Sequence, residues 1–295
     1  MIPAAKQRNP LATVLEMIKF EHTLFALPFA FLGMVLAAGG WPRWQTVGWI
    51  VVAMVGARSA AMGFNRLIDR RIDGENPRTA DRALPTGTVS ARFVGLFVVA
   101  SVALFLFAAW RLNPLAFRLA PIALAVLLGY SYTKRFTALS HLVLGLALGG
   151  APLGAWVAVR GEVTATPLVL MAVVVCWVAG FDILYSLQDL EFDRERGLHS
   201  IPVALGEKGA LLASSALHLV MLGLLAWIPS TYPPGLGWPW WLGVTGCAVL
   251  LGYQHSVVRP GDLSRLDAAF FQANGLLAVW LFVLGAVDVM LVSRG

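Results

Sequence analysis

The sequence predicts an all-α integral membrane protein. Three observations support this fold class: 58% of the 295 residues are hydrophobic, only 13% are charged, and the mean hydropathy is +0.75. Soluble domains carry about 25% charged and about 45–50% apolar residues, so the composition excludes an ordinary soluble enzyme. Disordered chains need low hydrophobicity and are excluded as well. The apolar runs are long and continuous, whereas a transmembrane β-barrel would show short alternating segments.

Nine segments are long and apolar enough to cross a bilayer, since a spanning helix needs about 20 mostly apolar residues. Pro28 predicts a kink in the first of them, and Pro114 and Pro239 mark the beginnings of two others. The nine spans are expected to form a single domain over residues 1–295. In chain order, the predicted spans are 22–39, 46–64, 93–111, 115–132, 141–159, 167–187, 209–228, 238–256 and 269–291.

The basic residues predict the orientation in the membrane. Most of the 22 lysines and arginines fall on the side that holds the N-terminus. Because cytoplasmic loops are enriched in these residues, we expect a cytoplasmic N-terminus and, after nine spans, a C-terminus on the outside. The net charge of +6 is then explained by basic loops beside anionic lipid, and no nucleic-acid partner is expected. The N-terminal residues show no apolar stretch followed by a cleavage site, so no removable signal peptide is expected.

Acidic residues are concentrated in two short segments. More than half of the 16 acids lie within 65–82 and 182–195, at the cytoplasmic ends of even-numbered spans. The first segment places Asn65, Asp69 and Asp73 four residues apart. The second repeats this spacing with Tyr185, Asp189 and Asp193, and therefore suggests that the chain consists of two related halves.

The repeated spacing predicts a metal site. Residues four apart share one face of a helix, where like charges repel each other. A divalent cation removes this repulsion, and Mg²⁺ prefers carboxylate and amide oxygens together with water and phosphate. One such pair is usually a solvated helix end, but two copies at equivalent positions favour magnesium ions that bridge the protein to a diphosphate. Basic residues expected at the same membrane face are Lys19, Arg66, Arg78, Arg82, Lys134 and Arg135.

Two charged residues, Arg58 and Asp182, fall inside predicted spans. Each would be costly in contact with lipid, so both are expected to face a cavity. Either they form an ion pair that locks two helices, or Arg58 binds the carboxylate of an acceptor while Asp182 acts at its hydroxyl group. His141 and His199 are weaker candidates for substrate contacts.

Three further expectations concern structure alone. Asn274 is expected to form a hydrogen bond between helices, and Gly145 and Gly149 are expected to permit close helix packing. Asp288, near the outer end of the last span, is expected to be solvated.

Several segments resemble the UbiA superfamily of intramembrane aromatic prenyltransferases. They are the NxxxDxxxD motif at 65–73, NPRTADRALPTG at 76–87, YSYTKRFTALSHLVLG at 130–145, DILYSLQDLEFDRERGLHSIP at 182–202 and IKFEHTLFALPFAFLG at 18–33. The resemblance covers most of the chain. It is closest to 4-hydroxybenzoate polyprenyltransferases and the related branch of menaquinone synthesis by the futalosine pathway. His199 departs from the pattern, because many 4-hydroxybenzoate enzymes carry lysine there.

The resemblance implies nine helices around a central cavity and a polyprenyltransferase of the bacterial inner membrane. Its implied reaction is magnesium-dependent transfer from a polyprenyl diphosphate to the ring of 4-hydroxybenzoate or a similar aromatic acid, in ubiquinone or menaquinone biosynthesis. The active site is implied at the cytoplasmic face. By motif position, the resemblance implies that magnesium and diphosphate are bound by Asn65, Asp69, Asp73, Asp189 and Asp193. Further diphosphate-binding positions implied by the resemblance are Lys19, Arg78, Tyr130 and Lys134. From their own place in the sequence, Arg66 is added to the diphosphate-binding residues, and Asp182, Tyr185 and Arg58 are predicted to be catalytic.

Two alternatives stay open. One is another UbiA-type prenyltransferase with a haem, chlorophyll or isoprenoid-lipid acceptor. The other is a cation-coupled transporter, because intramembrane Asp and Arg residues and internal repeats are also found there. The concentration of acids at one membrane face, away from the midplane, weighs against the transporter. A CDP-alcohol phosphotransferase is disfavoured because its DGxxAR opening is absent.

Overall fold

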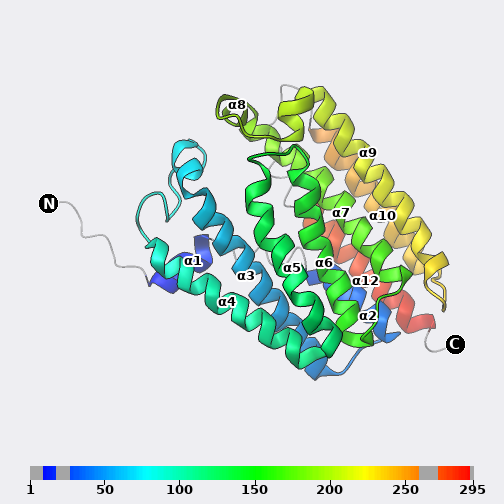
Figure 1. The fold of residues 1–295 in the computed structure, drawn as a ribbon. Coiled ribbons are helices and arrows are strands. Elements are labelled where there is room, and N and C mark those ends of the chain that lie inside the picture. Colours follow the sequence, from blue (N-terminus) through cyan, green and yellow to red (C-terminus); the bar gives the residue numbers. More distant parts are fainter. Residues whose placement is uncertain (1–8, 18–26, 259–271, 293–295) are drawn as a thin grey trace.

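The computed structural model describes residues 9–17, 27–258 and 272–292, and every regular element within these ranges is a helix (Figure 1). The elements are α1 (Pro10–Met17), α2 (Leu27–Ala38), α3 (Trp44–Glu75), α4 (Ala91–Leu112), α5 (Pro114–Thr133), α6 (Ser140–Arg160), α7 (Ala165–Ser186), the 3₁₀ turn η2 (Leu187–Asp189), α8 (Leu190–Glu195), α9 (Ile201–Thr231), α10 (Trp238–Val257) and α12 (Asn274–Val292).

Seven of the nine predicted spans correspond to described helices that are long and apolar enough to cross a membrane, namely α3, α4, α5, α6, α7 with its continuation, α9 and α12. The span predicted at 22–39 overlaps α2, of which the described part has 12 residues. The span predicted at 238–256 coincides with the 20-residue α10, whose tryptophans, Gln254 and His255 lower its hydropathy. The count of nine spans therefore stays a prediction, as does the kink at Pro28, because residues 18–26 lie outside the described ranges.

The structure corrects the second aspartate segment. Sequence spacing predicts that Asp182, Tyr185, Asp189 and Asp193 form one stripe on a single helix, but α7 ends at Ser186. Asp189 lies in the 3₁₀ turn and Asp193 in the short helix α8. A 3₁₀ turn has three residues per turn instead of 3.6, so it changes the direction in which the residues after it project.

Two helices are longer than the hydropathy pattern predicts. α3 continues through the whole first aspartate segment to Glu75, beyond the predicted end at residue 64. α9 begins at Ile201, eight residues before its predicted span, and is interrupted at Gly206, which has φ of 70°. That backbone conformation favours glycine, because a side chain would clash there.

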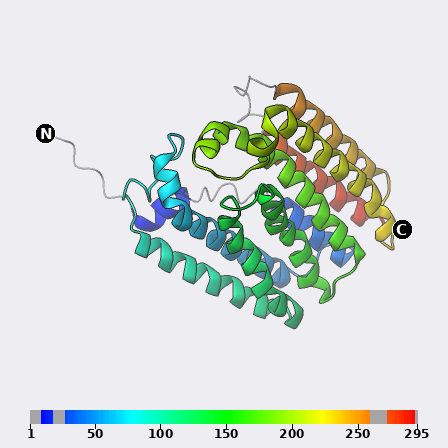
Figure 2. The same ribbon diagram turned by 45° about the horizontal axis from the view of Figure 1, so that its top comes forward.

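One half of the molecule is a closed ring of six helices. Each of α6, α7, α9, α10, α12 and α2 packs against the next, and α2 returns to α6 (Figures 1 and 2). Their inward faces form the largest buried apolar cluster, in which the rings of Phe29 and Trp177 lie 4.8 Å apart. Gly145 and Gly149 allow α6 to approach α7 so closely that an added Cβ would meet the carbonyl oxygens of Val175 and Met171. This confirms the predicted close contact.

The other half is more open. α3 packs along α4, and α5 lies between them and α6 (Figure 1). A largely apolar cavity of about 410 Å³ lies among these four helices, with Ile50, Leu112 and Val157 at one end and Asn65 and Tyr130 at the other. The description of this cavity as central to nine helices stays a prediction.

Two polar residues in α12 stabilise the ring. The indole Nε1 of Trp177 donates to Asn274 Oδ1 at 2.9 Å, which confirms the predicted interhelical hydrogen bond. The prediction that Asp288 is solvated is wrong, because its side chain is buried. Its carboxylate accepts hydrogen bonds from the backbone amides of Gly237 (2.9 Å) and Trp240 (2.7 Å) and so caps the N-terminus of α10.

Candidate active site

The last turns of α3 carry the first aspartate segment. Asn65 Nδ2 donates to Asp69 Oδ2 at 2.8 Å, one helical turn away. The second oxygen of Asp69 accepts a 3.0 Å hydrogen bond from Arg135, which follows α5. The first segment is therefore joined to the loop between α5 and α6.

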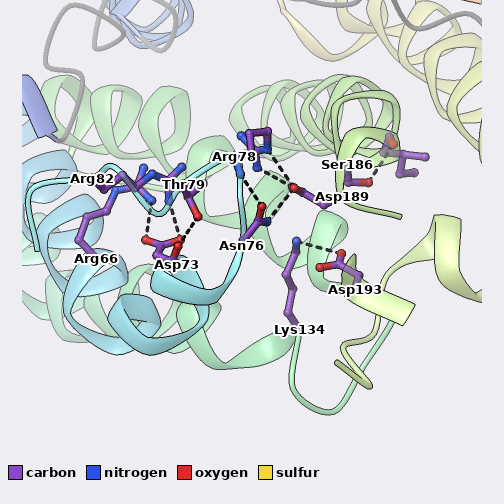
Figure 3. A network of polar contacts seen from close by, with 11 residues as sticks. Arg66, Asp73, Asn76, Arg78, Thr79, Arg82, Lys134, Ser186, Asp189 and Asp193 are labelled. Carbon is purple, nitrogen blue, oxygen red and sulfur yellow. Dashed lines mark hydrogen bonds and ion pairs between the residues drawn. The ribbon is translucent and has the colours of Figure 1, made fainter. Parts of the chain in front are cut away.

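Asp73 anchors the loop that follows α3. Its carboxylate pairs with Arg82 Nη1 at 2.6 Å, and its backbone carbonyl accepts a hydrogen bond from Thr79 Oγ1 at 2.9 Å. These contacts fold residues 76–82 back over the end of α3 (Figure 3).

The same loop reaches the second aspartate segment. Arg78 binds Asp189 through two hydrogen bonds, Nε to Oδ1 at 2.9 Å and Nη2 to Oδ2 at 2.6 Å. Asn76 Nδ2 adds a 3.1 Å hydrogen bond to Asp189 Oδ1 (Figure 3). Burial lowers the pKa of Arg78, but the hydrogen bonds and charge of Asp189 outweigh it and the net pKa is raised. The guanidinium also lies 5.6 Å over the ring of Tyr185.

Asp193 is joined to the loop after α5. Its Oδ2 lies 3.3 Å from Lys134 Nζ, and the backbone amide of His199 donates to the Lys134 carbonyl at 2.7 Å. The two aspartate segments therefore meet the loops after α3 and α5 in one polar network at one end of the helices (Figure 3).

Two buried atoms of this network find no hydrogen-bond partner among the described residues. They are Asp73 Oδ2 and Arg66 Nε. The nearest charged contact of Asp73 Oδ2 is Arg66 Nη1, at 3.6 Å. An unsatisfied buried acceptor beside an unsatisfied donor is costly in a resting protein, which favours a site completed by a cation and an anion.

The donor chemistry fits Mg²⁺. Hard oxygen atoms are offered by Asn65, Asp69, Asp73, Asp189 and Asp193. The Oδ2 atom of Asp73 accepts no hydrogen bond within the described residues and can therefore bind a metal ion. Over the ranges that the structure covers, no three His, Cys, Asp or Glu side chains converge on one point. Mg²⁺ typically uses one or two carboxylates and takes its other ligands from water and phosphate. A site with few converging protein ligands therefore suits Mg²⁺ when a diphosphate supplies further oxygen atoms.

Of the two residues expected on the acceptor side, Arg58 lines the cavity, as Asn65 and Tyr130 do. Asp182 Oδ2 is 2.7 Å from His141 Nδ1. The structure thus pairs Asp182 with His141. The ion pair between Arg58 and Asp182 stays a prediction. Lys19 lies outside the described residues.

Local spacing predicts no role for Asn76 or Thr79 and no contact between His141 and Asp182. Asn76 opens the NPRTADRALPTG segment, which is a usable signal, and the sequence predicts Arg82 and Arg135 only as charges at the same membrane face. Pairs such as Asn76 with Asp189, which are separated by 113 positions, leave no trace in local spacing.

Comparison with known proteins gives one consistent result. A model of the UbiA prenyltransferase family matches residues 26–283. A 4-hydroxybenzoate octaprenyltransferase from Cupriavidus metallidurans is 34% identical over 279 residues, which cover 93% of this chain and 92% of that protein. Another from Vibrio parahaemolyticus is 31% identical over 242 residues, with 82% and 84% covered.

Solved structures agree with the sequence matches. The apo structure of a UbiA homolog from Aeropyrum pernix superposes with a TM-score of 0.78 at 34% identity, over 92% of this chain and 98% of that one. A UbiA homolog from Archaeoglobus fulgidus, bound to DMAPP and Mg²⁺, superposes with a TM-score of 0.75 at 20% identity, over 94% and 99%.

Proposed function

Because the chain belongs to the UbiA prenyltransferase family and is a polyprenyltransferase, we propose that it prenylates 4-hydroxybenzoate or a similar aromatic acid. The donor is a polyprenyl diphosphate, and the product serves quinone biosynthesis, ubiquinone or menaquinone. The names of the relatives support this acceptor, since both are 4-hydroxybenzoate octaprenyltransferases. The helices place the protein in the bilayer, and we propose the bacterial inner membrane with the N-terminus and the active site on the cytoplasmic side.

One observation carries the proposal. The apolar cavity ends at Asn65 and Tyr130, and Asn65 is hydrogen-bonded to Asp69 of the polar network. An apolar chain therefore fits on one side of this junction and a highly charged head group on the other. A prenyl diphosphate has this division in a single molecule.

We assign the roles as follows. Asn65, Asp69, Asp73, Asp189 and Asp193 hold magnesium, which when bound neutralises the diphosphate and makes it a better leaving group. Arg78 and Lys134 bind diphosphate oxygens. Their ion pairs with Asp189 and Asp193 support this assignment, because both side chains already have anionic partners. Arg66, Tyr130 and Lys19 are assigned to the same group.

The chemistry is an electrophilic aromatic substitution. The C1–O bond of the donor breaks with its electron pair passing to the diphosphate, whose oxygens the basic residues bind. The apolar cavity walls exclude water, which would otherwise convert the allylic cation to an alcohol. The ring carbon ortho to the hydroxyl group bonds C1 and loses a proton.

On the acceptor side, Arg58 binds the carboxylate of the aromatic acid, for which a guanidinium offers paired donors. Asp182 accepts the ring proton, and Tyr185 orients Arg78 by contact of its ring with the guanidinium. The overall reaction converts a polyprenyl diphosphate and an aromatic acid to the prenylated acid, diphosphate and one proton.

The test is product identification. Purified protein in lipid nanodiscs is incubated with Mg²⁺, geranyl diphosphate and a panel of 4-hydroxybenzoate, hydroxynaphthoates and deoxyfutalosine-derived acids. We expect mass spectrometry to find a ring-prenylated 4-hydroxybenzoate and a matching amount of diphosphate. A product from another acceptor alone would overturn the proposed acceptor.

A further inference from the structure

His141 bridges three elements from a fully buried position in the first turn of α6. Its Nδ1 lies 2.7 Å from Asp182 Oδ2 on α7. Its Nε2 lies 3.3 Å from the backbone nitrogen of Ile201, the first residue of α9. Both ring nitrogens are therefore engaged, by groups of different chemistry.

The two partners together determine which nitrogen carries the proton. A backbone amide can only donate, so Nε2 must present its lone pair to Ile201. The ring proton of the neutral imidazole then sits on Nδ1 and points at Asp182. The other tautomer would set two N–H groups against each other at Ile201.

The N-terminus of α9 keeps the backbone amide of Ile201 available to His141. The first amides of a helix have no partner within the helix, so the Ile201 amide is available to a side chain. Ser200 caps the same turn by accepting a hydrogen bond from the Val203 amide at 3.3 Å, which keeps the amide of Ile201 in place.

Asp182 occupies a position that the proposed reaction uses. Its side chain is 21% exposed whereas that of His141 is 0% exposed, so the carboxylate forms the accessible end of the pair. It lies near Tyr130, a residue of the cavity wall.

We propose that His141 is a positioning residue: its Nδ1–H, fixed by the first backbone amide of α9, holds the Asp182 carboxylate in one orientation toward the acceptor. This rests on the proposed function, in which Asp182 receives the ring proton. Residues that orient a neighbouring ligating group are known from metal sites. Mutation of such an orienting residue typically lowers activity about 10- to 100-fold.

The experiment is a double-mutant cycle measured with whichever aromatic acid the wild-type protein prenylates. The variants are His141→Leu, Asp182→Asn and the double variant, with His141→Asn as the conservative change that keeps an amide donor near the Nδ1 position. We expect His141→Leu to lower kcat about 10- to 100-fold with the KM of the prenyl diphosphate within about twofold. His141→Asn should restore most of kcat, and His141→Leu should cause no further loss in the Asp182→Asn background.

Ser214→Ala is the matched control. Ser214 is equally buried and its hydroxyl donates to the Gly180 carbonyl at 2.7 Å, so it also joins two helices but lies outside the site. It should lower the melting temperature and leave kcat unchanged. If His141→Leu behaves like this control, or lowers kcat by the same factor with and without Asp182, the bond is only structural and the proposal is wrong.

A second measurement does not depend on the acceptor. Nitrogen-15 NMR of histidine-labelled protein, with His141→Leu for assignment, reports the protonation of each ring nitrogen. We expect an unprotonated Nε2 and a protonated Nδ1. A proton on Nε2 would overturn the proposal even if the proposed acceptor is correct, whereas the expected spectrum with no prenylated 4-hydroxybenzoate would refute the acceptor alone.

Discussion

Each aspartate of the two motifs is paired with a basic residue from outside its own helix. Asp69 binds Arg135, Asp73 binds Arg82, Asp189 binds Arg78, and Asp193 binds Lys134. Removing one member of a buried ion pair leaves an uncompensated charge and costs about 3–5 kcal/mol. Asp73, Asp189 and Asp193 are buried and Asp69 is half-buried, so these pairs matter more than ion pairs on an open surface.

Asp73→Asn should reduce turnover by at least about 100-fold while the protein still inserts in the membrane, because it removes a proposed metal ligand with an unsatisfied oxygen. EDTA should abolish wild-type turnover and Mg²⁺ should restore it, as measured by diphosphate release. Glu162→Gln is the control, since Glu162 pairs with Arg160 in an exposed position at the other end of α6. Full activity of Asp73→Asn in EDTA would contradict the magnesium role.

Arg58→Leu should raise the KM of the aromatic acid far more than the KM of the prenyl donor. Arg58 lines the cavity seven residues before Asn65, about 10 Å further along α3 from the diphosphate end. Initial-rate measurements with each substrate varied in turn give the two constants. Equal changes in both would indicate a structural role for Arg58 instead.

At the scale of elements, hydropathy located the helices but not their ends. A window of apolar residues stops at residue 64, although α3 continues through Asp73 to Glu75. The carboxylates of Asp69 and Asp73 are paired by arginines of the loops, which stabilises this charged end of the helix. Spacing of four residues was equally compatible with the continuous α3 and with the interrupted α7–η2–α8 segment. The interruption depends on tertiary contacts, because Asp189 accepts hydrogen bonds from Arg78 and Asn76 of the loop after α3.

For the candidate site, the sequence likewise predicts the residues but not their contacts. Residue types and spacing were enough to select the aspartates and the basic residues around them. They could not pair Lys134 with Asp193 or His141 with Asp182, because these contacts form only when α5, α6 and α7 are packed.

The position of Gly154 along α6 predicts how the cavity can be changed to limit the length of the prenyl chain. Gly154 lines the cavity, has open space where a Cβ would stand, and lies 13 residues beyond His141, about 20 Å along the helix. Gly154→Leu should therefore spare geranyl diphosphate and lower kcat/KM for long polyprenyl diphosphates by at least about tenfold, because only long chains reach that depth.

Competition between short and long donors, resolved by mass spectrometry, measures this preference. Gly223→Leu provides the matched control, because Gly223 also has open space but lies on an exposed face of α9 away from the cavity. Equal loss for both donors in Gly154→Leu would mean that the chain does not pass this residue.

At the scale of the whole molecule, the polar network gathers at one end of the helices, where the loops after α3, α5 and α7 meet (Figures 2 and 3). Diphosphate should then enter from a single side of the membrane, which we propose is the cytoplasm. The apolar tail stays in the bilayer region, since each buried CH₂ contributes about 0.8 kcal/mol.

Cysteine labelling tests this topology in a variant in which Cys176 and Cys247 are alanine. Gly74→Cys should react with an impermeant reagent only in inside-out vesicles, and Mg²⁺ with diphosphate should protect it. Position 74 is exposed and has room for a side chain, whereas Gly197 at φ of 64° would be strained by one. Glu162→Cys, in the opposite loop, should react only from the outside of intact cells, and the reverse pattern would overturn the orientation.

The closed ring joins helices from both ends of the described chain. α2 packs between α6 and α12, and at Gly285 there is no room for a side chain beside Leu32. During synthesis α2 enters the membrane first, but its partner α12 leaves the ribosome only after some 250 further residues have been added. The ring can therefore be closed only after α12 has been synthesised, and one apolar face of α2 must be shielded by lipid or by the insertion machinery until then. Maturation of this protein consequently waits for α12, although the aspartates and the cavity are encoded far upstream.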